Sequence, residues 1–186
     1  MKRLYLLAVL GIAALLLNSG VYAVEEGKPF STPVVKGEEH HHAISAHHKN
    51  AAEHAKALHH HAARHSDLNK AVAREHAEEI EHSLAAAERH LTDLEKVLTP
   101  SEKEEMANSL ETIQTQLSAA KEDNQAILDE LKKARPSSEA VKTHAARVHS
   151  HVTKAEAEHK KMMEKRGVRE PAEPAREEEI RDTDFH

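Results

Sequence analysis

The chain has 186 residues, enough for one domain, and it contains 18 histidines but no cysteine. The lack of cysteine excludes disulfides, thiolate metal ligands and lipid attachment through a cysteine within this sequence. Acidic side chains outnumber lysine and arginine by 32 to 26, which argues against a basic nucleic-acid-binding surface.

The first predicted element is a secretory signal peptide over residues 1–23. It starts with two basic residues, continues with the apolar run 4–17, and ends with the small residue Ala23 before the expected cleavage site. An uncleaved membrane anchor is the alternative, but about 14 apolar residues are fewer than the roughly 20 needed to span a bilayer. We therefore expect a periplasmic protein that begins at Val24, with no membrane attachment after cleavage. Its 24 basic and 32 acidic side chains would give a formal charge of about −8.

The next predicted feature is a helical domain over residues 38–166, flanked by two segments, 24–37 and 167–186, that we expect to be disordered. The domain contains no glycine and only two prolines, Pro100 and Pro136. It also contains no Phe, Tyr or Trp, so its core must be built from aliphatic side chains and alanine. Such a composition favours closely packed helices over a sandwich, a barrel or a large substrate pocket.

Local sequence signals divide this domain into four helices. Ser66 or Asp67 can cap a second helix, Thr99 and Glu102 form a capping box, and Pro136 marks the third turn. The expected helices are 38–65, 68–98, 100–134 and 137–166. Similar lengths and short turns predict an all-α, up-down-up-down four-helix bundle. A helix that runs unbroken through residues 66 and 67 is the alternative, and it would give a long helical hairpin or an oligomeric coiled coil.

Apolar residues in the last three helices recur in alternating steps of three and four, as a coiled-coil seam requires. One seam position of the third helix is polar, Asn124, which can set the packing register. The first helix differs because the same pattern places histidine at every second seam position. Its predicted inward face consists of His40, Ile44, His47, Ala51, His54, Leu58, His61 and His65.

The histidines of this face need ligands from other helices to hold an ion. Seven residues of helix rise about 10.5 Å, which is too far for two histidines at that spacing to share an ion bound at about 2 Å. Only His61 and His65, one turn apart, can chelate from a single helix. The predicted partners across the first and fourth helices are His144 with His61 and His65, His151 with His54, and His159 with His47.

The second helix adds two histidines, His76 and His90, that flank its seam, whereas His82 should point outward. A faint repeat of about 22 residues aligns Glu53-His54-Ala55 with Glu75-His76-Ala77. The third helix has no histidine. The histidines that we expect to be solvated surface side chains are His41, His48, His59, His149 and His186.

Imidazole nitrogen suits Zn(II), Cu(II) and Ni(II), and nearby glutamates can complete the coordination or orient the rings. Buried imidazoles without partners would each carry a desolvation cost, which also favours a ligand role. The predicted metal ligands are His47, His54, His61, His65, His76, His144, His151 and His159.

Two other metal chemistries are weaker alternatives. Glu79 with His82, and Glu156 with His159, match the Glu-x-x-His motif of di-iron carboxylate bundles, but His82 is expected to face away from the core. Met162 and Met163 with His159 could offer sulfur and nitrogen to copper, although methionine at a helix end more often fills the core.

Three segments between residues 54 and 91 combine histidine with small and acidic residues. They are His54-Ala55, the turn His65-Ser66-Asp67-Leu68, and His76-Ala77-Glu78-Glu79 with His82. These segments resemble those of the periplasmic, histidine-rich small metal-binding protein family. The resemblance implies a four-helix bundle that binds Cu(II) and other divalent ions, although the histidine-free third helix departs from that family's compact pattern.

Together these patterns predict a non-enzymatic metal buffer, scavenger or chaperone that exchanges Cu(II), Zn(II) or Ni(II) with a transporter or efflux component. The sequence leaves open whether the protein forms oligomers. The alternative is a pH-responsive periplasmic helical stress protein, because histidine titrates near pH 6.5. A ferritin-like di-iron oxidase is a third hypothesis.

Overall fold

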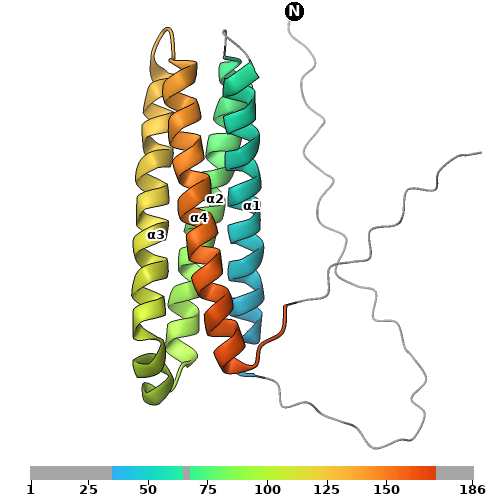
Figure 1. Cartoon of the computed structure of the whole chain (residues 1–186), viewed down its shortest axis with the longest axis vertical. Coiled ribbons are helices and arrows are strands. Elements are labelled where there is room, and N and C mark those ends of the chain that lie inside the picture. The colour runs from blue at the N-terminus through green and yellow to red at the C-terminus, as the bar shows by residue number, and fades with distance from the viewer. Residues whose placement is uncertain (1–34, 65–67, 171–186) are drawn as a thin grey trace, which may run out of the picture. The chain divides into compact units, whose positions relative to one another are not determined.

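The computed structural model describes residues 35–64 and 68–170. The predictions for the signal peptide, for His65 and for His186 lie outside these residues. The described part forms four helices and no strand (Figure 1). They are α1 (Glu38–Arg64), α2 (Lys70–Val97), α3 (Pro100–Lys132) and α4 (Ser138–Arg166).

The four helices form an up-down-up-down bundle, as the sequence predicted. Each helix packs against the next one in the chain, and α4 packs against α1 to close the ring (Figure 1). Helix α1 ends at Arg64 and antiparallel α2 begins at Lys70, so the alternative of one unbroken helix is not observed. No helix in the two described stretches is long and apolar enough to cross a membrane.

Side-chain caps fix where the helices begin. The predicted capping box is present at α3, where the Thr99 side chain accepts from the Glu102 backbone N–H and the Glu102 carboxylate accepts from the Thr99 backbone N–H. At α2 the cap is Asn69, whose side chain accepts from two backbone N–H groups, so this helix starts two residues later than predicted. The cap of α4 is Ser137.

The carboxyl end of α4 belongs to the packed structure. Gly167 ends the helix with a left-handed backbone, φ 70°, a conformation that glycine adopts without steric cost. The next residue, Val168, is buried and donates its backbone N–H to the Met163 carbonyl at 2.9 Å. The first residues after α4 therefore pack onto the bundle end.

The core is aliphatic and alanine-rich, as composition required. The predicted seams of α2, α3 and α4 are buried, including Ile80, Ile113 and Val148. The polar residue Asn124 lies within this core, and its Nδ2 donates to the Ala77 carbonyl at 3.0 Å. This bond ties α3 to α2 at one fixed register.

Candidate metal centre

Helix α1 buries different histidines from those that the seam predicted. His41 and His48 are 0% and 1% exposed. They form one column, at a spacing of seven residues, with the buried alanines Ala55 and Ala62. The predicted column at positions 40, 47, 54 and 61 is instead half-buried. The apolar residues Ile44, Ala51 and Leu58 are common to both patterns.

The observed choice has a clear physical cause. A seam through His41 and His48 also buries two alanines, whereas the predicted seam would have buried histidine at all four of these positions. Because each buried imidazole loses hydration, the first arrangement costs less free energy. The interpretation of His41 and His48 as solvated surface side chains was therefore wrong.

The buried histidines meet α4 in a chain of hydrogen bonds. Arg166 Nη1 lies 3.1 Å from His41 Nε2, and because a guanidinium can only donate, this ring nitrogen must accept. His41 then carries its hydrogen on Nδ1 and donates it to His159 Nε2 at 2.9 Å. His159 in turn donates from Nδ1 to Ser45 Oγ at 3.3 Å, and Ser45 donates to the sulfur of Met163 at 3.6 Å.

Burial keeps the His41 and His159 rings neutral. It is the largest cause that lowers the pKa of His159 to about 2, and the neighbouring His41 and His48 are the further causes. Burial also lowers the pKa of His41 to about 4, with the positive charge of Arg166 as the second cause. Both imidazoles therefore stay neutral at pH 7, which is the state that can donate a lone pair to a metal.

His48 contacts α4 through a carboxylate. Its Nδ1 lies 3.0 Å from Glu156 Oε2, so the ring donates its Nδ1 hydrogen to the carboxylate. In the neutral ring the buried Nε2 then carries a lone pair, and it has no hydrogen-bond partner among the described residues; the same holds for Glu156 Oε1. One ligand atom from each of His48, Glu156 and His159 lies within 4.8 Å of the others, a spacing that can surround a single ion.

Two predicted ligands on α4 point to α3 instead of α1. His144 Nδ1 lies 2.7 Å from Asp123 Oδ1, and His151 Nε2 lies 3.6 Å from the other carboxylate oxygen. His151 also bonds Gln116 through Nδ1 at 2.8 Å. The predicted pairing of these two residues with His61 and His54 was wrong, and Asp123 was not anticipated.

The third predicted ligand on α4, His159, does face α1, but it meets His41 and His48 and not His47. The predicted ligands His47, His54, His61 and His76 lie half-buried on α1 and α2. The cross-helix contact between His54 and His76 joins the two residues that the 22-residue repeat had aligned.

The di-iron pattern is only half present. Glu156 and His159 turn towards α1, but Glu79 and His82 on α2 are both exposed. Met162 and Met163 are buried, consistent with core filling, and Met163 also ends the hydrogen-bond chain at Ser45.

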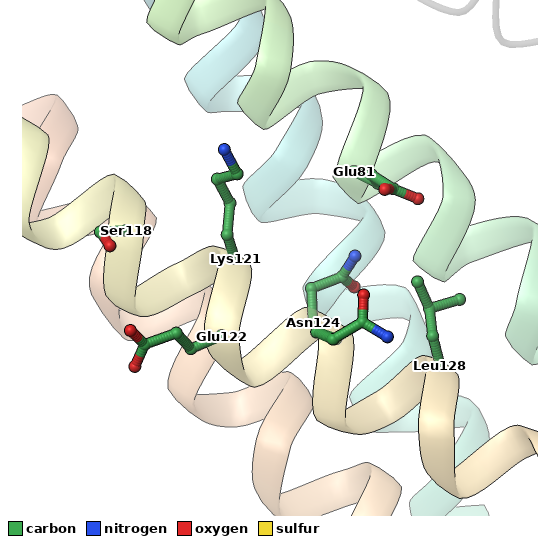
Figure 2. Close-up of a pocket in the computed structure, with 7 residues that line it drawn as sticks. Glu81, Ser118, Lys121, Glu122, Asn124 and Leu128 are labelled. Carbon is green, nitrogen blue, oxygen red and sulfur yellow. The ribbon is translucent and has the colours of Figure 1, made fainter.

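A hollow between α2 and α3 is separate from these histidines (Figure 2). Its lining residues are Glu81, Ser118, Lys121, Glu122, Asn124, Gln125 and Leu128. None of them is a histidine, and the charged side chains among them are exposed. The groups that could ligate a metal ion therefore lie elsewhere in the described part of the bundle.

No protein-family model, curated protein or solved structure matches this chain.

Proposed function

We propose that this protein binds a divalent transition-metal ion as cargo, with His48, Glu156 and His159 as the ligands of its central site. The observation that carries the proposal is the pair of buried atoms without hydrogen-bond partners, His48 Nε2 and Glu156 Oε1. A buried acceptor without a partner costs about 1–3 kcal/mol. A cation bound to either atom would offset that cost at the atom it contacts. For one cation to contact both atoms, the Glu156 carboxylate must release the Nδ1 hydrogen of His48.

The donor set fits Zn(II), Cu(II) or Ni(II). Two imidazole nitrogens and one carboxylate oxygen form a ligand set that these ions accept, with water as a further ligand. His159 would exchange one of its ring hydrogen bonds for the metal. A net hydrogen bond contributes about 1 kcal/mol, whereas binding to a protein metal site can release about 10 kcal/mol or more.

The burial of the site favours binding over catalysis. His48 and His159 are almost completely buried, and the Glu156 side chain is only 15% exposed. An ion can reach the site past Glu156, but an organic substrate would have to displace packed core. We therefore propose a metal buffer, scavenger or chaperone, and not an enzyme.

We further propose that the protein works in the periplasm and exchanges ions with a transporter or efflux component. The support is the basic start and apolar run of residues 1–23 and the absence of cysteine. Mass spectrometry of the exported chain should find a mature protein that begins at Val24. An exported chain that still carries residues 1–23 would contradict this location.

The test of the central site is a calorimetric titration at pH 7 with Zn(II), Cu(II) and Ni(II). The variant Glu156→Gln keeps the size of the side chain but removes its charge, and we expect the tightest binding to weaken by at least ten-fold. The matched control is Glu158→Gln on the same helix, where the carboxylate bonds Ser109 and Lys161 and not the cluster. Equal tight binding by the wild type and Glu156→Gln, or no saturable binding at all, would overturn the proposal.

A second candidate function, an acid-responsive helical protein, is supported by the lowered pKa values of His41 and His159. The two proposals differ in their response at constant pH. Micromolar Zn(II) at pH 7 should raise the melting temperature of a metal binder, and it should leave that of a purely acid-responsive protein unchanged.

A further inference from the structure

We propose a second class of metal site, the groove sites, along the contact between α1 and α2. Two imidazole pairs form these sites: His54 with His76, and His40 with His90. This second class extends the proposed metal binding to a different face of α1 and uses none of the three central ligands. Each pair takes one side chain from α1 and one from α2. The ligand class is a divalent transition ion held by two imidazoles and water.

The antiparallel register of α1 and α2 creates both pairs. His40 and His54 are 14 residues apart on α1, and His76 and His90 are 14 residues apart on α2. Fourteen residues of helix rise about 21 Å. The two pairs can therefore hold separate ions without repulsion between adjacent charges.

The nitrogen separations match those of neighbouring ligands on one ion. The two Nδ1 atoms lie 3.0 Å apart in the pair of His54 and His76, and 3.4 Å apart in the pair of His40 and His90. Nitrogens bound at about 2.0–2.1 Å are about 2.9 Å apart at a right angle and about 3.3 Å apart at the tetrahedral angle. One Nδ1 of each pair carries the hydrogen that the other accepts, and this ring must change to the tautomer with its hydrogen on Nε2 before both nitrogens can bind an ion. Each pair can then receive an ion with little movement of the backbone.

A third imidazole lies beside one of these pairs. The ring of His47 stacks on that of His90, with ring centroids 5.6 Å apart and an angle of 17° between the planes. His40 also contacts His90, at the same centroid distance. Rotation of His47 about its side-chain bonds could bring a third nitrogen to this pair, so we expect it to bind an ion more tightly than the pair of His54 and His76.

The groove sites differ from the central site in access to solvent. The His40 side chain is 21% exposed, whereas its sequence neighbour His41 is fully buried. The doublets His40-His41 and His47-His48 thus place one ring towards α2 and the next towards α4. Ions in the groove sites should exchange with solvent faster than an ion in the central site.

The experiment counts the Cu(II) ions bound per full-length mature chain, by equilibrium dialysis at pH 7 with micromolar free Cu(II) and glycine as a competing ligand. We expect the double variant His76→Ala/His90→Ala to bind two ions fewer than the wild type. The complementary triple variant His40→Ala/His47→Ala/His54→Ala removes the α1 half of each pair together with His47, and it should lose the same two ions. His149→Ala, on α4 and outside both groups, is the matched control and should lose none.

The outcomes separate this inference from the central site. Two ions lost in both the double and the triple variant, with helical circular dichroism unchanged, would support the groove sites. The loss of these two ions would support the groove sites even if Glu156→Gln bound metal as tightly as the wild type, a result that would overturn the central site. An unchanged count in either the double or the triple variant would overturn the groove sites. An equal loss in His149→Ala would also overturn them, because it would mark nonspecific binding to surface histidines.

Discussion

Acid should destabilise the metal-free bundle through two histidines, His41 and His159. Their ordinary pKa of 6.5 falls to about 4 and about 2 in the folded state, so the unfolded chain binds protons first as pH decreases. The contribution to stability is complete above pH 6.5 and is lost progressively as the pH falls below that value. At pH 5, about 1.5 pH units below the unfolded pKa, each ring lowers the free energy of unfolding by about 2 kcal/mol, because one pKa unit corresponds to about 1.36 kcal/mol. A total near 4 kcal/mol is a large part of the roughly 5–15 kcal/mol that stabilises a domain.

The assay is urea unfolding of the chelator-treated protein at pH 7 and pH 5, followed by circular dichroism. Other groups also titrate in this range, so the comparison that isolates the two rings is the variant His41→Gln/His159→Gln. This variant should lose about 4 kcal/mol less than the wild type between the two pH values, whereas the exposed-site control His60→Gln should behave as the wild type. The same pH dependence in the double variant and the wild type would refute the assignment of acid sensitivity to these two rings.

Two further predictions concern the packing of the bundle. Thr99→Ala removes the side-chain cap of α3 and should lower the free energy of unfolding by about 1 kcal/mol; an unchanged urea midpoint would show that the capping box adds nothing. Asn124→Leu removes a buried amide whose Oδ1 has no partner among the described residues, next to the hollow that can accept a larger side chain. It should raise the melting temperature while weakening the fixed register of α2 and α3, and a lower melting temperature would contradict this account.

The bundle could be predicted from the sequence because α2, α3 and α4 each have only one apolar seam, so only one face of each helix can turn inward. In α1 two columns flank the shared apolar residues Ile44, Ala51 and Leu58, and histidine occurs in both columns. Ala55 and Ala62 in the second column were the available signal, since alanine can be buried without desolvating a polar group. Giving these alanines more weight than the histidine periodicity would have placed His41 and His48 inside.

The partners of the α4 histidines could not be predicted in the same way. His144 and His151 each flank a buried seam residue, and the sequence does not say which neighbouring helix lies on that side. The answer depends on the handedness with which the four helices follow one another around the ring, a property of the whole bundle. In this fold the side is that of α3, where Asp123 and Gln116 accept the ring hydrogens.

The hydrogen-bond chain that starts at Arg166 has a fixed polarity. Since Arg166 can only donate, it decides which nitrogen of His41 is a lone pair, and that choice passes on to His159 and then to Ser45. A ring buried in the core thus takes its tautomer from a guanidinium two hydrogen bonds away. Arg166 also bonds Glu102 at the start of α3 and the Lys36 carbonyl before α1, so the closure of the bundle end and the direction of these hydrogens depend on the same side chain.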